Sequence, residues 1–341
     1  MLAPARFSWL RRVCLGALTL ALSCGAPLTT HAAGPTVRVR LSHVVAPDTP
    51  KGRMAERFRT LVAQRSGGRI RVEIYPDSSL YGDDDEMEAL RLGAVEMLAP
   101  SLSKFAAVGI TEFEVFDLPF LFKNLNEVRC VTHGPIGEQL LQRLARQQMV
   151  GLGFLDNGFK QMSAHRPLQS PEAYRGLRLR VQASQVLADQ MRALGAQPVV
   201  MSFGETQRAL AQRVVDGTEN PLSNFLTQRL AAVQPAITLS SHGYLGYAVV
   251  ANPMFWNSLS PVDRQTLRRA LSDALEEGNR LSAALDAQAL HELRATPGVQ
   301  VHAVSAPQRR VLRGAVQQVY NAFVERGGGP VLRDIQASCL R

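Results

Sequence analysis

Hydrophobic and polar positions alternate in two segments of the chain, and a helical pattern separates them. In VRVRLSH (residues 37–43) and RIRVEIYP (residues 69–76), every second residue is apolar. This period of two predicts β-strands with one buried face. Between them, Met54, Phe58 and Leu61 recur at helical spacing, and SGGR then ends the pattern. The order predicted here is strand, helix, strand.

The same order continues through the middle of the chain. Further strand-like segments are VEMLAPS (95–101), MVGLGFLDNG (149–158), LRLRVQAS (177–184), AQPVVMSF (196–203) and VVDGTENP (214–221). Helical patterns lie between them. Such alternation predicts the α/β class, with parallel or mixed sheets covered by helices.

Two of the expected helices begin with distinctive polar residues. DDDEMEALRLG (residues 83–93) opens with three aspartates, which complement the positive end of a helix dipole. We interpret them as a solvated cap rather than a metal site. In SFGE, Ser202 and Glu205 have the spacing of a capping box, which predicts a helix from there to about Val214.

One helical pattern is unusually long. It begins at the cap residue Ser260 and carries a leucine stripe over about 35 residues, with Gly278 as the expected place for a bend. At 1.5 Å per residue, such a helix reaches about 50 Å, which exceeds one small domain. Because no flexible linker interrupts the chain, we expect two α/β units joined by strands or short crossings, as in a hinged two-lobed protein.

The first 33 residues have the composition of a secretory signal peptide. Three arginines precede the apolar run VCLGALTLALSCGA, and cleavage is expected near Ala32 or Ala33. A lipoprotein cleavage site before Cys24 is the alternative. The apolar run is too short for a membrane span, and no later run approaches 18 apolar residues. We therefore expect an exported, periplasmic protein without stable membrane insertion of the mature chain.

Removal of the signal peptide leaves two cysteines, Cys130 and Cys339. An even pair in an oxidising compartment suggests one disulfide that tethers the C-terminal tail; two unpaired thiols are the alternative. CVTH, which begins at Cys130, has the look of a metal-site fragment, but no second ligand pair accompanies it. No metal is expected.

Charge and motifs exclude several function classes. The formal charge of +9 falls to about +6 without the signal peptide, the cations are scattered, and aromatic residues make up only 6%. Nucleic acid is therefore not an expected partner, whereas anionic small molecules are. The sequence contains no phosphate-binding glycine motif and no nucleophile elbow, and its histidines are dispersed. Neither a catalytic centre nor a cofactor is predicted.

Two arginines stand out in the segment GLRLRV. Strand alternation places Arg178 and Arg180 on the face opposite the leucines. Arg180 is nearer the carboxyl end of the strand, where open α/β sheets bind ligands, and its planar guanidinium matches a carboxylate. Arg178 lies deeper and is expected to pair with a surface Asp or Glu.

Asn220 ends the next expected strand, immediately before Pro221. Its amide can donate a hydrogen bond to a ligand carboxylate while the proline fixes the exit of the chain. The alternative is that Asn220 only satisfies backbone groups of the turn.

Six motifs together resemble the solute-binding proteins of TRAP (tripartite ATP-independent periplasmic) transporters, in the dicarboxylate-binding family. They are GLRLRV, LGAQPVVMSFGETQRAL, VVDGTENPL, HGYLGYAVVAN, FDLPFLF and FWNSLS. The resemblance implies a two-lobed clamshell in which each lobe is a mixed sheet flanked by helices and the long helix spans both. Residues 34–157 plus 246–280 would form lobe I, and residues 158–245 plus 281–341 would form lobe II.

The resemblance also implies roles for individual residues. Arg180 would hold the ligand carboxylate, with Asn220 beside it. The family often has an arginine after its GF motif, but this chain reads NGFKQMSA and has Lys160 there, which keeps the charge without the bidentate fork. Phe203 matches an aromatic residue that lines the cleft of the family.

Three further residues fall at strand ends that would face the cleft. These weaker candidates are His43, Ser101 and Tyr244.

The resemblance implies that the protein captures a small organic acid anion, closes about a hinge, and delivers the ligand to TRAP membrane subunits without a cofactor. Two alternatives stay open. One is an exported enzyme for carboxylated substrates, with His43, His242 or Glu219 as the base; the other is a ligand sensor for a signalling partner. Selectivity among dicarboxylates, keto acids, sugar acids and cyclic amino acid derivatives depends on the shape of the cleft.

Overall fold

The computed structural model of the protein describes residues 37–340. The predicted signal peptide and its alternative cleavage sites lie outside the described residues. None of the helices between residues 37 and 340 combines the length and the apolar character needed to cross a bilayer.

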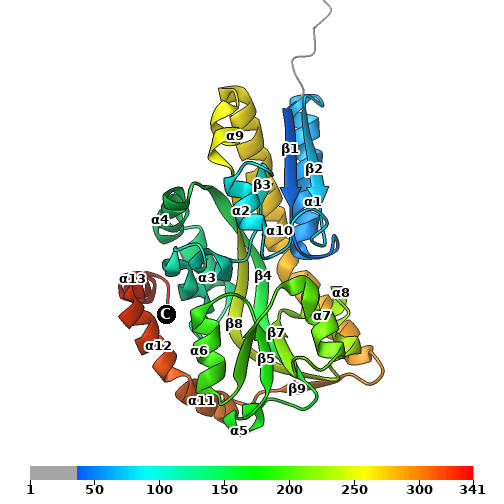
Figure 1. Cartoon of the computed structure of the whole chain (residues 1–341), viewed down its shortest axis with the longest axis vertical. Coiled ribbons are helices and arrows are strands. Elements are labelled where there is room, and N and C mark those ends of the chain that lie inside the picture. Colours follow the sequence, from blue (N-terminus) through cyan, green and yellow to red (C-terminus); the bar gives the residue numbers. More distant parts are fainter. Residues whose placement is uncertain (1–36, 341) are drawn as a thin grey trace, which may run out of the picture. The chain divides into compact units, whose positions relative to one another are not determined.

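The described strands form one mixed sheet (Figure 1), in the order β2-β1-β3-β8-β4-β7-β5-β6, with β9 paired to β8. Their bounds are β1 (Val37–Ser42), β2 (Ile70–Tyr75), β3 (Met97–Leu98), β4 (Val150–Ala164), β5 (Arg178–Val181), β6 (Gln197–Val200), β7 (Gly217–Asn220), β8 (Ala236–Ala251) and β9 (Gln300–Ala303). The predicted α/β class is confirmed. β9 was not predicted as a strand, and β8 was anticipated only through the strand end expected at Tyr244.

The two long strands β4 and β8 connect both halves of the sheet. They pair antiparallel over almost their whole length, while β3 pairs with the end of β8 and β7 with the opposite end of β4. One of the register shifts between them falls between Asp156 and Gly158, opposite Leu245 and Gly246. The two expected sheets are therefore joined into one by shared strands.

The helices cover this sheet and alternate with the shorter strands. Their bounds are α1 (Pro50–Ser66), α2 (Glu86–Arg91), α3 (Leu125–Thr132), α4 (Pro135–Arg143), α5 (Pro171–Tyr174), α6 (Gln185–Ala193), α7 (Phe203–Ala211), α8 (Leu222–Thr227), α9 (Pro253–Ser258), α10 (Pro261–Ala295), α11 (Ala306–Ala315), α12 (Gln317–Phe323) and α13 (Gly329–Ser338). Short 3-10 segments include η1 (Leu102–Ala106) and η2 (Thr111–Asp117).

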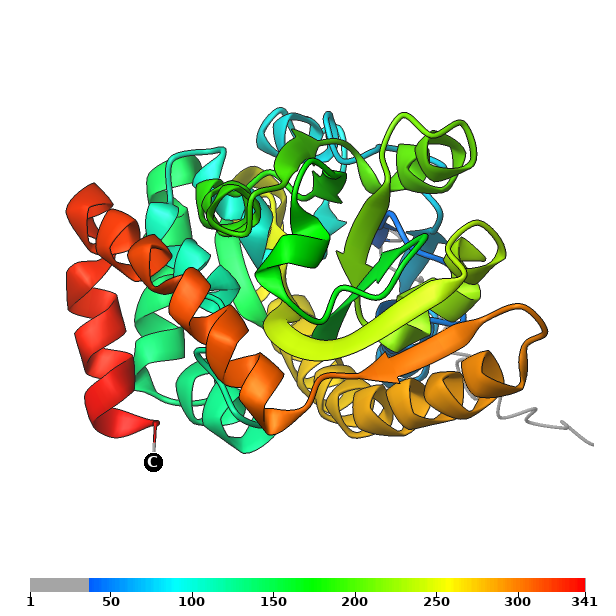
Figure 2. The same ribbon diagram turned by 90° about the horizontal axis from the view of Figure 1, so that it is seen from below.

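The long helix α10 is continuous, as predicted, and contacts α1, β4, α8 and β9. It thus runs past both halves of the sheet, as Figure 2 shows from below. Gly278 permits close packing: a Cβ atom there would lie 2.7 Å from Leu155 Cδ1 and 3.1 Å from Met54 Cβ. Gly278 therefore lies where the helix packs closely against α1 and β4.

The capping-box prediction for α7 is wrong, although the helix begins after Ser202 as expected. The backbone carbonyl of Ser202 accepts from Thr206, and the side chain of Glu205 pairs with Arg208 at 3.1 Å. The helix ends at Ala211, short of Val214, where Arg213 takes a left-handed φ of 57°.

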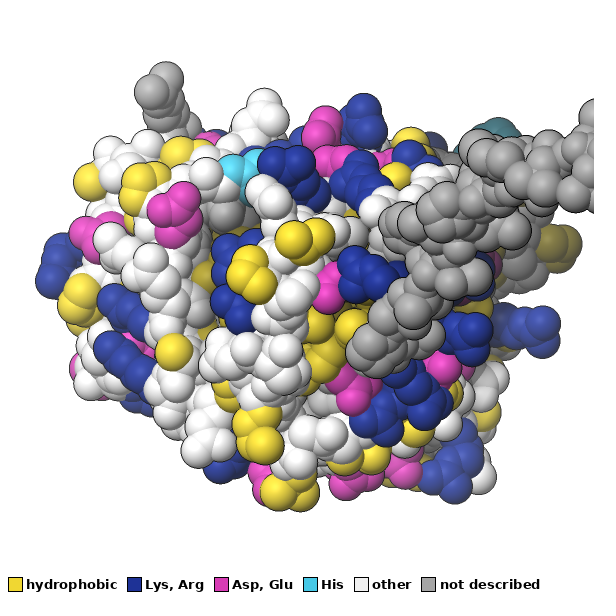
Figure 3. Space-filling view, turned by 90° about the horizontal axis from the view of Figure 1, so that it is seen from above, with side chains coloured by type: hydrophobic (Ala, Val, Ile, Leu, Met, Phe, Trp, Pro, Cys, Tyr) yellow, Lys and Arg dark blue, Asp and Glu magenta, His cyan; other side chains and the backbone are white. Residues whose placement is uncertain are grey.

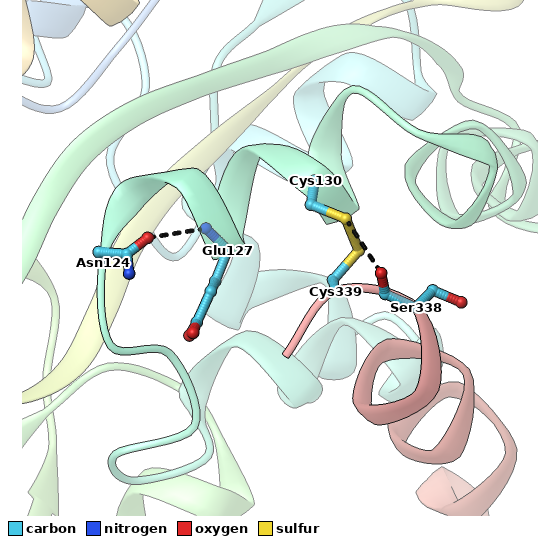
Figure 4. Close-up of a disulfide and its surroundings, with 5 residues drawn as sticks. All are labelled: Asn124, Glu127, Cys130, Ser338 and Cys339. Carbon is cyan, nitrogen blue, oxygen red and sulfur yellow. Dashed lines mark hydrogen bonds between the residues drawn. A yellow bond between two sulfur atoms is a disulfide. The ribbon is translucent and has the colours of Figure 1, made fainter. Parts of the chain in front are cut away.

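The predicted disulfide between Cys130 and Cys339 is confirmed. It joins α3 to the residue that follows α13 (Figure 4), with the two Cα atoms 5.6 Å apart. In the same close-up, Asn124 Oδ1 accepts from the backbone N–H of Glu127 at 3.0 Å and caps the start of α3. The bond therefore attaches the C-terminal helices to a well-capped helix.

Candidate functional site

A small cavity lies where the carboxyl ends of β1, β3, β5 and β7 meet. Its free volume is about 20 Å³. Its lining comes from both halves of the sheet: Val44, Val45, Lys51, Asp83, Ser101, Lys104, Gln182, Phe203, Asn220, Asn224, Leu245 and Tyr247. Open α/β sheets bind ligands at this end of their strands. The cavity is therefore the candidate ligand site.

Of the buried cations in and around this cavity, two are neutralised by carboxylates. Lys104 forms ion pairs with Asp83 and Glu86. Lys160 Nζ lies 2.8 Å from Glu219 Oε1 and 3.5 Å from Asp117 Oδ1. Each of these lysines thus faces two carboxylates.

Arg180, the third buried cation, is held by neutral groups. Its side chain comes from β5, and the residue is only 1% exposed. Its Nε and Nη2 atoms donate to the carbonyl oxygen of Met201 at 3.0 and 2.8 Å, and its guanidinium lies 5.6 Å from the centre of the Phe203 ring. Burial lowers the pKa of Arg180. Between residues 37 and 340, no carboxylate forms an ion pair with it.

Lys51, the fourth buried cation, is the second residue of α1 and is also 1% exposed. Its Nζ atom donates to the carbonyl oxygen of Ala99 at 3.0 Å and lies 3.9 Å from the centre of the Tyr247 ring. Burial lowers the pKa of Lys51 to about 7. Neither of these two contacts is an anion, but the nearby carboxylates of Glu86 and Asp83 favour its charged form.

The amides at the end of β7 form a hydrogen-bonded chain. Asn220 Oδ1 accepts from Asn224 Nδ2 at 3.2 Å, while Asn224 Oδ1 accepts from Asn157 Nδ2 at 3.1 Å. The Nδ2 atom of Asn220 is buried and has no hydrogen-bond partner among the described residues. Because Asn220 lines the cavity, this donor is available to a ligand oxygen.

Two hydrogen bonds connect residues on different sides of the cavity. Gln182 Nε2 donates to Ser101 Oγ at 2.8 Å, and the backbone N–H of Phe203 donates to Asp83 Oδ2 at 2.5 Å. The interpretation of the three aspartates as a solvated cap is wrong for Asp83, whose side chain is only 10% exposed. Burial opposes its ionisation, but Lys104 outweighs this and lowers the pKa of Asp83. Asp84 and Asp85 are exposed, as expected.

A buried acid–base cluster lies behind the cavity. Glu219 Oε2 is 2.7 Å from His242 Nε2, and His242 Nδ1 is 2.7 Å from Ser240 Oγ. Burial opposes ionisation of Glu219, but Lys160 and His242 lower its pKa to about 2. Burial raises the pKa of Asp117 to about 6. Lys160, expected to contact the ligand, belongs to this cluster and not to the cavity lining.

The other sequence candidates divide into two groups. Phe203, Ser101 and Asn220 line the cavity. His43 and Tyr244 do not: His43 is buried below the lining, and the Tyr244 hydroxyl donates to Asp156 Oδ1 at 2.7 Å within an aromatic cluster.

Arg178 is confirmed as a surface charge, paired with Asp216 at 2.9 Å. On the face that Figure 3 shows, lysines and arginines are interspersed with acidic and apolar side chains rather than gathered in one patch.

The sequence reasoning missed Lys51, Asp83, Lys104 and Gln182. One signal could have found the lysines. The chain has only four lysines but 34 arginines, and Lys51, Lys104 and Lys160 are three of the four. In a chain that uses arginine for most of its cations, the rare lysines therefore pointed to positions where a buried cation is needed.

Comparison with known proteins identifies the family of the chain. A family model described as bacterial extracellular solute-binding protein, family 7, matches residues 41–326. The C4-dicarboxylate-binding periplasmic protein DctP of Rhodobacter capsulatus is 43% identical, over 96% of this chain and 99% of that protein.

Among solved structures, a TRAP periplasmic solute-binding protein of Shewanella oneidensis with bound succinate superposes with a TM-score of 0.87. It is 39% identical, over 89% of this chain and 99% of that one. A second, from Pseudomonas aeruginosa with bound L-malate, has a TM-score of 0.81 and 37% identity, over 84% of this chain and 99% of that one.

Proposed function

The chain belongs to family 7 of the bacterial extracellular solute-binding proteins, and we propose that it captures a small organic acid anion in its cavity for delivery to TRAP membrane subunits. The observation that supports this most directly is Arg180, a buried guanidinium at the carboxyl end of β5 with only neutral partners. A ligand carboxylate would supply the missing anion. Asn220 Nδ2, which also has no partner among the described residues, adds a donor to the same ligand.

Capture would proceed by closure of two lobes about a hinge. The proposed boundaries cross β4 at residues 157/158 and β8 at 245/246, and the register shift between Asp156 and Gly158 falls at this place. The third crossing lies in α10, beside Asn279, whose Oδ1 accepts from the Asp156 backbone N–H at 2.7 Å. A ligand that contacts both lobes stabilises the closed state, because only that state offers both sets of contacts.

We place the mature protein in the periplasm. The signal peptide expected in residues 1–33 supports export. The Cys130–Cys339 disulfide agrees with an oxidising compartment.

Binding is favoured over catalysis by the position of the candidate bases. Glu219 and His242 contact each other at 2.7 Å and lie outside the cavity lining, and His43 lies outside it as well. We expect the purified protein to leave every tested organic acid chemically unchanged, as followed by NMR. Turnover of any acid would favour catalysis instead.

The decisive experiment compares two arginines of the same strand. Arg180→Ala is expected to weaken succinate binding by at least ~3 kcal/mol, the scale for truncating one partner of a buried charged pair. Arg178→Ala removes an exposed ion pair and is expected to change binding by less than about 1 kcal/mol. Titration calorimetry measures both, with circular dichroism as the check on folding. Unchanged affinity in Arg180→Ala would contradict the proposal.

A further inference from the structure

On the basis of the proposed function, we propose that Asn157 is a positioning residue for ligand binding. It directs a chain of three side-chain amides so that Asn220 presents an N–H group, and not its carbonyl oxygen, to the cavity. Three features of the molecule support this role: the place of Asn157 in β4, the direction of the hydrogen bonds along the chain, and the unpartnered donor at its end.

Asn157 occupies the irregular position of β4. It lies between Asp156 and Gly158, where the pairing with β8 shifts its register. A residue inserted into a strand pair in this way leaves the regular ladder, and its side chain is aimed in a new direction. The side chain of Asn157 is fully buried and contacts α8, although Asn157 itself does not line the cavity.

The amide of Asn157 donates to two residues that line the cavity. Its Nδ2 atom donates to the Tyr247 hydroxyl at 2.9 Å and to Asn224 Oδ1 at 3.1 Å. Its Oδ1 atom accepts from the Ser223 hydroxyl at 3.2 Å. All four residues are buried. Because both N–H groups of the amide have partners, a substitution at Asn157 alters the wall of the cavity without removing a ligand contact.

The hydrogen bonds from Asn157 to Asn220 run in one direction. The amide of Asn157 donates to Asn224, and the amide of Asn224 donates to Asn220 Oδ1 at 3.2 Å. The last group of the chain, Asn220 Nδ2, is buried and has no hydrogen-bond partner among residues 37–340. This direction therefore leaves a donor in the lining of the cavity. The opposite direction would leave a carbonyl oxygen there.

An anionic ligand requires the direction that the structure shows. A carboxylate only accepts hydrogen bonds, so an N–H group stabilises it and a carbonyl oxygen repels it. At the far end of the chain, the hydroxyls of Ser223 and Tyr247 can donate or accept, and they serve either direction. The amides and the ligand therefore determine the direction together. Asn157→Asp enforces the opposite one, because an ionised carboxylate has no donor.

The test is a double-mutant cycle, measured by titration calorimetry with succinate and L-malate. Asn157→Asp and Asn220→Ala are each expected to weaken binding by about 10-fold or more, the scale of a hydrogen bond to a charged group. In the Asn220→Ala background, which lacks the group that Asn157 directs, Asn157→Asp is expected to change the affinity by less than about 3-fold. Asn321→Asp is the matched control, because it adds the same charge at an exposed position of α12 and should leave the affinity unchanged.

The outcomes separate this inference from the proposed function. A wild type that binds neither acid contradicts the proposed function itself. If the wild type binds, three results overturn the role of Asn157 alone: an unchanged affinity in Asn220→Ala, an unchanged affinity in Asn157→Asp, or an equal loss from Asn157→Asp with and without Asn220. The last result would show that the added charge acts on the ligand directly.

A second variant keeps the test decisive if Asn157→Asp does not fold by circular dichroism. Asn157→Ala adds no charge and also removes the donor to Asn224. Its loss of affinity must again be smaller in the Asn220→Ala background than in the wild type. Equal losses in the two backgrounds overturn the inference.

Discussion

The carboxylate of Asp83 accepts a hydrogen bond at 2.5 Å from the backbone N–H of Phe203 and thereby joins the loop before α2 to the first residue of α7. The same carboxylate forms an ion pair with Lys104. The proposed boundaries assign Asp83 to lobe I and Phe203 to lobe II, so with these boundaries the contact would form only in the closed state. It makes Asp83 a proposed latch between the lobes, and its charge also acts on Arg180 and Lys51.

Removal of this latch should shorten the lifetime of the complex. Asp83→Ala is expected to raise the dissociation rate of succinate by about 10-fold, in line with the loss of one hydrogen bond to a charged group. Stopped-flow fluorescence measures the rate. Glu88→Ala, on the exposed side of α2, is the control and should leave it unchanged. Equal dissociation rates for Asp83→Ala and wild type would show that the latch has no role.

Loss of the Lys160 charge should destabilise the protein strongly. Lys160→Met leaves Glu219 and Asp117 buried without their cation, and removing one partner of such a pair costs about 3–5 kcal/mol. Urea unfolding gives the free energy. In the control, Lys123→Met, the lost charge is exposed and lies 3.9 Å from Glu127, so a loss of at most about 1 kcal/mol is expected. Similar stabilities for the two variants would contradict the structural role of Lys160.

His43 should make the stability depend on pH. Burial and the charge of Lys51 lower its pKa from 6.5 to about 3, so the unfolded chain takes up the proton first as the pH falls. The contribution of His43 is therefore complete above pH 6.5 and is lost as the pH falls towards 3. Between pH 7 and pH 5 this loss amounts to about 2 kcal/mol.

The variant His43→Gln lacks this proton uptake. Its free energy of unfolding should fall by about 2 kcal/mol less than that of the wild type between pH 7 and pH 5. Urea titrations at the two values provide the comparison, and His133→Gln, at an exposed position, should behave like the wild type. Parallel pH profiles for wild type and His43→Gln would rule out a buried neutral His43.

The disulfide should affect stability and not affinity. Replacement of Cys130 and Cys339 by serine is expected to lower the free energy of unfolding by about 2–4 kcal/mol, because the unfolded chain loses its cross-link. Neither residue lines the cavity, so succinate affinity should stay within about 2-fold of the wild type. A large loss of succinate affinity with unchanged stability would contradict a purely stabilising role of the disulfide.

Sequence patterns predicted most of the local structure because each of these elements has a local cause. The alternation of apolar and polar residues predicted β1 and β2, and the leucine stripe predicted α10. The positions of Arg178 and Arg180 along β5 predicted which of the two lies on the surface. The pairing of β9 with β8 was not predictable in this way. Gln300–Ala303 is a short strand whose partner, Ala236–Leu239, lies about sixty residues earlier in the chain.

The site was predicted only in part, because burial of a charge is a tertiary property. Lys51 lies in the first turn of a helix and Asp83 just before another, where charged residues are usually solvated. Tertiary contacts remove these groups from water, among them the Tyr247 ring near Lys51 and the Phe203 backbone N–H at Asp83. Lys160 carries the expected charge, but its ammonium group forms ion pairs with Asp117 from η2 and Glu219 from β7.

The Cys130–Cys339 bond also bears on the maturation of the chain. Its two sulfur atoms are separated by 209 positions, and an exported polypeptide crosses the membrane from its N-terminal end. Under the proposed export, Cys130 would cross before Cys339, and the bond would form only after every described strand of the sheet had crossed. The oxidised bond would then distinguish fully translocated molecules from arrested ones, and a non-reducing gel would test this.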